Sequence, residues 1–147
     1  MIQKVSWNKI HQIWKNQLWP SRTSAIEPVS AMVYLGGYSN ENMHFTPSFF
    51  GYFVDNNLVG VNSGHQCTGK SYRSRGLWVD EHYRKQGIGS ALLAATIDQA
   101  MIESCKFVWS YPRKTSWSTY QSVGFILSSE WEQSETSEAN AYCIKEI

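Results

Sequence analysis

The pattern with the clearest chemical meaning is a turn at positions 84–89, Arg-Lys-Gln-Gly-Ile-Gly. The first backbone N–H groups of a helix have no partner inside the helix, and the helix dipole adds about half a positive charge there. Gly87 and Gly89 have no Cβ, so an anion can approach the backbone closely. Arg84 and Lys85 add formal positive charge. At the start of a helix, this turn predicts an anion site suited to a pyrophosphate.

The two cations of the turn conflict with helix stability, because acidic side chains are the ones favoured in a first helical turn. The conflict favours an anionic ligand over a merely solvated helix start. Two other phosphate-binding patterns are excluded. The chain has no GxxxxGK[ST] P-loop, and Gly87-Ile88-Gly89 is not followed by the third glycine of a dinucleotide fingerprint.

The elements before the turn are a helix and a series of strands. Ser6 is a suitable cap for the first helix, and Pro20 ends it. Asp55-Asn56-Asn57 is a hairpin signal, so the runs on either side of it are expected to pair antiparallel. A second turn is expected at 68–70. The strand-like runs are Ala31–Leu35, Phe49–Val54, Leu58–Ser63 and Tyr72–Val79.

The hydrophobic period changes after Val79, and Gly87 to about Cys105 is predicted to form one long helix. Its apolar residues form two stripes, which predicts a helix covered on more than one side. A strand at 107–111, expected parallel to the one ending near Val79, a short helix at 117–122 and strands at 125–131 and 139–147 complete the chain. This order predicts one domain over 1–147, a mixed, mostly antiparallel α/β sheet flanked by helices.

The sequence resembles the GNAT-type N-acetyltransferases. Their signature is a strand, then [RQ]xxGx[GA], then a long helix, and residues 84–89 match every fixed position. A second family marker, NxxAxxxY…GF, is matched at its tyrosine, glycine and phenylalanine but not at its asparagine and alanine. These positions are Tyr120, Gly124, Phe125, Arg113 and Ser116, in that order. The resemblance covers roughly residues 49–147 and implies a GNAT-like fold with acetyl-CoA as co-substrate.

The resemblance also implies where the cofactor would bind. An acyl-CoA cleft would lie where two neighbouring strands splay apart. The strand before the turn would bind the pantetheine arm, and the turn amides would hold the pyrophosphate. The cofactor-binding residues would be Leu77, Trp78, Val79, Arg84, Lys85, Gln86, Gly87, Ile88, Gly89 and Ser90.

Acetyl transfer to an amine requires a neutral amine and a protonated leaving thiolate. Tyr120 is the candidate acid, because the resemblance places it beside the cofactor sulfur and a phenol is protonated at pH 7. The alternative is a tyrosine that only packs. No base stands out, and His65, Glu81 and a base acting through water all stay open.

Charged and aromatic residues outside the turn bear on the acceptor. An acidic loop, formed by Glu130, Glu132, Glu135 and Glu138, would favour a cationic amine. Arginines and a tryptophan favour an acceptor that also carries an anion, so an amino acid, a peptide end and an aminated sugar stay open. We therefore expect a small-molecule or peptide amine. The substrate-binding candidates are Trp19, Arg22, His65, Arg73, Arg75 and Glu132.

Composition excludes several other classes of protein. A formal net charge of +1 argues against a nucleic-acid partner, and no apolar run is long enough for a membrane span. The three cysteines form no CxxC pair, so we expect no metal site. Their odd number suits a reducing cytoplasm. We expect a soluble cytoplasmic protein, with homodimer formation left open.

Two rival functions remain. The chain could be a catalytically inactive acyl-CoA-binding module, since no base is evident and Arg113 and Ser116 depart from the family marker. It could also be an aromatic-rich carbohydrate-binding or interaction domain, given seven tryptophans. The last hypothesis leaves the strand, turn and helix around residues 84–89 unexplained.

Overall fold

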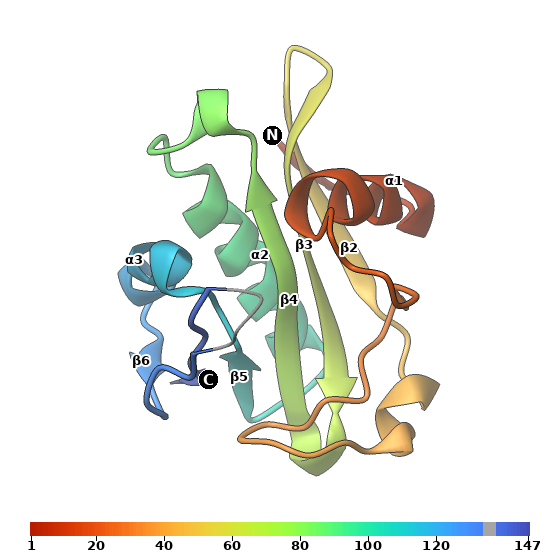
Figure 1. Ribbon diagram of the computed structural model, residues 1–147, viewed down its shortest axis with the longest axis vertical. Coiled ribbons are helices and arrows are strands. Elements are labelled where there is room, and N and C mark those ends of the chain that lie inside the picture. The colour runs from red at the N-terminus through yellow and green to blue at the C-terminus, as the bar shows by residue number, and fades with distance from the viewer. Residues whose placement is uncertain (134–137) are drawn as a thin grey trace.

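The computed structural model describes residues 1–133 and 138–147. A seven-stranded sheet forms its centre, with the strand order β1-β2-β3-β4-β5-β7-β6 (Figure 1). All neighbours pair antiparallel except β4 and β5, which are parallel and joined through α2. The mixed, mostly antiparallel sheet is therefore confirmed. The strands are β1 Ile2–Lys4, β2 Ser48–Val54, β3 Asn57–Cys67, β4 Ser71–Val79, β5 Phe107–Ser110, β6 Ile126–Leu127 and β7 Cys143–Glu146.

The hairpin between β2 and β3 has the expected turn. Asp55 and Asn56 have positive φ angles of 49° and 67°. Two successive left-handed residues give the type of turn whose twist matches that of an antiparallel pair. The turn thus sets the register in which Val54 pairs with Asn57.

Helix α1 (Trp7–Ile13) covers one face of the sheet. The Ser6 side chain accepts a hydrogen bond from the Lys9 N–H at 3.4 Å, as expected of its cap. The helix continues into a π-helical segment, Trp14–Leu18, which ends before Pro20. Ile10 and Trp14 are fully buried and pack with Val61 of β3.

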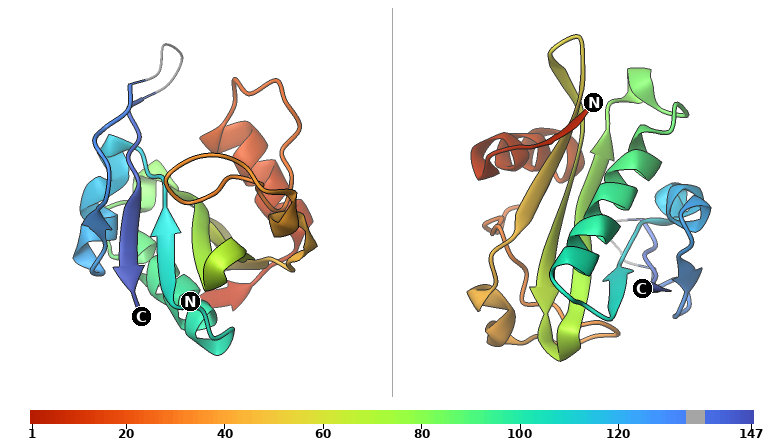
Figure 2. Two further views of the ribbon diagram at one scale, coloured as in Figure 1. Left: turned by 90° about the horizontal axis from the view of Figure 1, so that it is seen from below. Right: turned by 180° about the vertical axis from the view of Figure 1, so that it is seen from behind.

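Helix α2 (Ile88–Ile102) covers the opposite face, as Figures 1 and 2 show together. Leu92 and Leu93 point to two different apolar clusters and are both fully buried, which confirms a helix covered on more than one side. The expected stripes end earlier than predicted, because Met101 and Ile102 are 54% and 74% exposed. The short helix α3 (Trp117–Ser122) packs beside α2. No described helix is long and apolar enough to cross a membrane.

The strands differ from expectation in two places, and one further strand was not predicted. Residues 31–35 form a turn closed by a single bridge from Met32 to Tyr38. Their apolar side chains suggested a strand, but Met32 and Tyr34 instead pack on the cluster that contains Trp109. The last two strands are shorter than expected, since regular pairing is confined to β6 and β7. The N-terminal strand β1 was not predicted, because three residues are too few to show an alternation.

Candidate active site

The cleft of interest opens where β4 and β5 separate. The two strands pair only from Ser71 with Phe107 to Arg73 with Trp109. Beyond Arg73 they diverge, and a cleft of about 710 Å³ lies between β4, the start of α2, the chain after β5, and α3. The resemblance had placed the cofactor cleft between two splayed strands.

A β-bulge on the other edge of β4 accompanies this separation. The register with β3 jumps from the pair Val61–Trp78 to the pair Ser63–Arg75, so Gly76 and Leu77 oppose one residue of β3. Gly76 has a φ of +78°, the left-handed conformation that glycine supplies in many bulges. A Cβ on Gly76 would lie within 2.3 Å of ring atoms of Trp14. The bulge therefore bends β4 where the cleft begins, and it requires glycine.

The turn before α2 has the features of an anion site. Gly87 occupies the N-cap position with φ 81°, and no side chain of the described residues caps the first amides of the helix. A Cβ on Gly87 would meet nothing within 4 Å, so the space in front of these amides is open. Arg84 and Lys85 are exposed beside this space, and the Arg84 Nε donates to the Val79 carbonyl oxygen at 3.0 Å.

Gly89 lines the cleft and also has a role in packing. A Cβ there would lie 2.9 Å from the Cγ2 atom of Thr119 on α3. Gly89 therefore allows α3 to approach the start of α2, whereas Gly87 leaves room for a ligand. Ser90 joins the same contact, because its Oγ lies 2.9 Å from the Ser122 Oγ.

The structure brings nearly all the predicted cofactor residues to one cleft. Each of them except Gln86 lines it, and Gln86 is exposed to solvent on the turn. The strand residues Leu77, Trp78 and Val79 lie along one wall, and the turn residues lie at one end. Their roles as ligand contacts stay a prediction.

Tyr120 lies on the cleft wall formed by α3 and is only 3% exposed. Its Oη is 3.5 Å from the Ser110 Oγ, and the Ser110 hydroxyl donates to the Ser74 carbonyl oxygen at 2.7 Å. Because Ser110 has only one proton to donate, its oxygen is left as an acceptor for Tyr120. Burial raises the pKa of Tyr120 to about 12, so the phenol is protonated at pH 7.

Neither side chain that the sequence offered as a base reaches the cleft. His65 is fully buried away from it, with Nδ1 2.9 Å from the Gln66 carbonyl oxygen and Nε2 accepting from the Ser30 N–H. Burial lowers the pKa of His65 to about 3, so the ring is a neutral structural element. The structure thus does not bring His65 to the cleft, and its roles as a base and as a substrate contact stay untested predictions. Glu81 lies in an exposed turn of 3-10 helix outside the cleft.

The candidates for the acceptor divide into two groups. Trp19, Arg73 and Arg75 line the cleft. Arg22 does not. Its Cζ lies over the Trp19 ring, 5.5 Å from the ring centre, and its Nη2 donates to the Ala25 carbonyl oxygen. Glu132 does not line the cleft itself. It accepts a hydrogen bond of 2.5 Å from the hydroxyl of Tyr111, which does.

The acidic loop reaches the cleft through one described residue. Glu138 lines the wall, 3.9 Å from the Nη1 of Arg113, whereas Glu130 is exposed outside it. Glu135 lies outside the described residues. The described part of the loop therefore brings one carboxylate to the cleft, and that carboxylate faces a cation.

Sequence reasoning missed several cleft residues. Arg113 donates through Nη2 to the Leu18 carbonyl oxygen at 2.9 Å, and Asn140 donates to the Tyr111 carbonyl oxygen at 3.0 Å. Arg113 thus ties the segment after α1 to the chain after β5. Its only signal in the sequence was its departure from the family marker.

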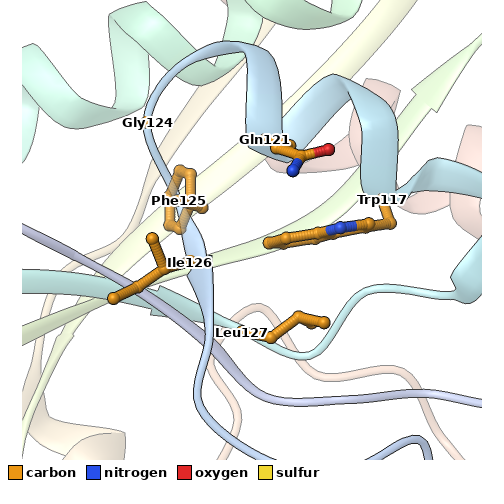
Figure 3. Close-up of a pocket in the computed structure, with 6 residues that line it drawn as sticks. All are labelled: Trp117, Gln121, Gly124, Phe125, Ile126 and Leu127. Atoms are coloured by element: carbon orange, nitrogen blue, oxygen red, sulfur yellow. The ribbon is translucent and has the colours of Figure 1, made fainter.

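A second hollow, of about 420 Å³, lies on the outer side of α3 (Figure 3). Trp117, Phe125, Ile126 and Leu127 form most of its wall, with Gln121 as the polar side chain. None of the described residues that line it is titratable. The cleft with Tyr120 is the better candidate for chemistry.

Comparisons with known proteins agree with this geometry. The model of the Acetyltransferase (GNAT) family matches residues 10–125. No curated protein matches the chain at a significant level. Solved structures match at low sequence identity and show the same fold.

Three of these structures illustrate the likeness. An aminoglycoside 6'-N-acetyltransferase complexed with coenzyme A matches with a TM-score of 0.71 and 11% identity, over 99% of this chain and 96% of that one. Ard1 from Thermoplasma volcanium matches with a TM-score of 0.68 and 17% identity, over 100% of this chain and 97% of that one. An acetyltransferase of the GNAT family from Staphylococcus aureus Mu50 matches with a TM-score of 0.68 and 13% identity, over 99% of this chain and 98% of that one.

Proposed function

Because this chain belongs to the GNAT family of acetyltransferases, with acetyl-CoA as co-substrate, we propose that it acetylates a primary amine directly. The reaction takes place in a ternary complex with a small-molecule or peptide amine. The observation that carries the proposal is that one cleft contains both an uncapped helix start and Tyr120. A reducing cytoplasm suits the three free, buried cysteines.

The described residues fit an acyl-CoA ligand. The open space before Gly87, the free first amides of α2 and the two exposed cations suit a pyrophosphate. Beyond Arg73, the edge of β4 that faces β5 pairs with no strand of the described chain. Backbone groups on such an edge need partners, and a pantetheine arm carries amides that can supply them. Leu77, Trp78 and Val79 are the residues that would bind it.

In the proposed reaction, the amine nitrogen forms a bond to the acetyl carbon and the carbon–sulfur bond breaks. The electron pair of that bond goes to the sulfur, which gains a proton as the amine loses one. The thioester supplies the activated acetyl group. The chain supplies orientation of the two substrates and a proton donor beside the sulfur.

The pKa of Tyr120 restricts what this donor can do. A thiol has a pKa of roughly 8.5, so complete proton transfer from a phenol of pKa about 12 is uphill by roughly 5 kcal/mol. Tyr120 therefore donates a hydrogen bond to the sulfur as negative charge develops there. A full transfer is coupled to the proton that the amine releases. Before the substrates bind, the Tyr120 hydroxyl donates its hydrogen bond to the Ser110 Oγ instead.

The amine must be neutral when it attacks. An alkylamine of pKa about 10.4 is mostly protonated at pH 7, so a base is needed. Within the described chain, Glu138 is the carboxylate on the cleft wall. We assign the amine proton to Glu138 or to water in the cleft.

Two measurements test this proposal. Thermal unfolding with and without acetyl-CoA reports binding, and thiol detection with a panel of primary amines reports transfer. Stabilisation by acetyl-CoA together with thiol release that depends on an amine supports the N-acetyltransferase. Stabilisation with no thiol release for any amine supports an inactive acyl-CoA-binding module instead. No stabilisation contradicts both.

A further inference from the structure

Two arginines on β4, Arg73 and Arg75, line the cleft without a carboxylate partner among residues 1–133 and 138–147. We propose that Arg73 and Arg75 bind an anionic group of the acceptor, so that the acceptor is an amine that also carries a carboxylate or a phosphate. The inference rests on the proposed function and specifies its substrate class. Both side chains belong to the face of β4 opposite α2, because the alternating residues Tyr72 and Ser74 face α2. Tyr72 packs in the α2 cluster, and Ser74 accepts a hydrogen bond from Asn62, which also donates to Thr96 of α2.

Both cations are wholly or partly removed from water. Arg75 is 6% exposed, and burial lowers its pKa to about 9, so it remains charged at pH 7. Arg73 is partly exposed, but its Nε is buried and makes no hydrogen bond within the described residues. Buried charges in proteins are ordinarily paired, because an unpaired one costs several kcal/mol of desolvation.

The described chain supplies no such partner. Neither arginine forms an ion pair with a carboxylate of residues 1–133 or 138–147. Arg75 donates through Nη1 to the Glu27 carbonyl oxygen at 2.6 Å, a neutral acceptor. The missing negative charge is therefore expected from a ligand.

Aromatic rings hold both guanidinium groups in place. Arg73 lies over Trp109, 5.0 Å from the ring centre, and Arg75 lies over Trp14 at 4.8 Å and Trp19 at 5.5 Å. A cation–π contact does not use up the five N–H donors of a guanidinium, so donors remain for other partners. Those N–H groups form the fork that pairs with carboxylate or phosphate oxygens. The rings therefore preorganise an anion receptor.

The position of the pair suits an acceptor. Arg73 is the last residue of β4 that pairs with β5, and its positive charge is close enough to Tyr120 to lower the pKa of that phenol, against the larger effect of burial. The anionic group would thus lie near the point where the amine meets the thioester. The pyrophosphate site is at the other end of β4, beyond Val79, so the two anion sites do not compete.

The charge of the cleft also argues against a purely cationic acceptor. Arg73, Arg75 and Arg113 line this end, whereas the described wall has Glu138 as its carboxylate, beside Arg113. Like charges repel, so the excess of positive charge at this end would disfavour binding of a polyamine such as spermidine. An amine with an attached anion would not.

Matched acceptor pairs test the inference on the unaltered protein. L-alanine, L-methionine and L-phenylalanine are each compared with the corresponding amino acid amide, and glucosamine 6-phosphate is compared with glucosamine. We expect one class of anionic member to exceed its neutral partner by at least about 30-fold in kcat/KM, which is about 2 kcal/mol. The amino acid amides have the less basic amine, so a preference for the free acid cannot come from the protonation state. The pair that shows the excess identifies carboxylate or phosphate.

Variants assign the preference to the two arginines. In Arg73→Gln and Arg75→Gln the ratio should fall below about 3-fold through a higher KM for the anionic member. Arg73→Lys keeps the charge without the fork and should give an intermediate ratio. Lys15→Gln removes an exposed cation outside the cleft and should leave the ratio unchanged. Stabilisation by acetyl-CoA in each variant shows that it is folded and binds its co-substrate.

Three results overturn the inference. One is equal or faster turnover of the neutral members or of spermidine. Another is a ratio that Arg73→Gln and Arg75→Gln leave unchanged, and the third is an equal loss of kcat for both members of a pair. If acetyl-CoA binds but no amine reacts, the proposed function fails separately. Calorimetric binding of N-acetyl-L-methionine against its amide then judges the subsite, and equal affinities overturn it.

Discussion

The Nε1 of Trp14 donates a hydrogen bond of 2.8 Å to the carbonyl oxygen of Gly76 and joins the first helical segment to the bulge of β4. The same indole occupies the space where a Cβ of Gly76 would lie. The contact spans 62 positions of the sequence and fixes the segment after α1 to β4, the strand that borders the cleft.

Gly76→Ala should be strongly destabilising. The new methyl group would overlap the Trp14 ring at 2.2 Å, and φ of +78° strains any residue with a Cβ. Overpacking and strain together predict a loss of about 3 kcal/mol in the free energy of unfolding, measured by urea denaturation. Gly37→Ala is the matched control, because Gly37 has φ of +85° and nothing within 4 Å. Similar losses in both variants would show that the ring contact contributes little.

Gly87→Asp should abolish stabilisation by acetyl-CoA. The residue adds bulk and negative charge to the open space before the first amides of α2. Wild-type protein at a hundredfold excess of ligand over Kd should gain about 2.7 kcal/mol, read from thermal unfolding. Gly87→Asn is nearly the same size, tolerates positive φ and has no charge, so any binding it retains measures the contribution of charge. Unchanged affinity in Gly87→Asp would remove the turn from the pyrophosphate site.

The parts of the fold that sequence predicted well are those that local interactions decide. Gly87 is followed by a long apolar helix, so the start of α2 was predicted to within a residue. The Asp55-Asn56-Asn57 hairpin was equally clear, because the turn requires positive φ at two residues that tolerate it.

The parts that sequence could not predict depend on distant contacts. The bulge at Gly76 changes which face the residues of β4 occupy, and only the pairing with β3 reveals it. Arg113 reaches the Leu18 carbonyl oxygen across 95 positions, and no local pattern indicates that contact. His65 was a candidate base because the sequence does not show that it is fully buried and does not line the cleft.

Acid should destabilise the protein through His65. Its pKa is about 3 in the folded state and about 6.5 when unfolded, so the unfolded state binds more protons between these values. Stability therefore falls as the pH is lowered through this window, and His65 alone should account for about 2 kcal/mol between pH 7 and pH 5. Urea denaturation at both pH values measures the loss. His65→Gln cannot titrate, so its pH dependence should be shallower by that amount, and parallel curves would contradict the assignment.

Tyr120→Phe should slow acetyl transfer and leave cofactor binding intact. The variant keeps the buried ring and removes a hydroxyl that would act mainly in the transition state, so kcat should fall by about 10²-fold. The hydroxyl makes one long contact, to Ser110 at 3.5 Å, so the free energy of unfolding should fall by no more than about 1.5 kcal/mol. Tyr72→Phe is the control, because Tyr72 is also buried but lies outside the cleft, and its hydroxyl has no hydrogen bond within the described chain. That variant should retain full activity and equal or greater stability. The measurements are kcat with an amine acceptor and thermal unfolding of all three proteins. If Tyr120→Phe turns over within threefold of wild type while chemistry limits the rate, the proton reaches the sulfur from water or from another side chain.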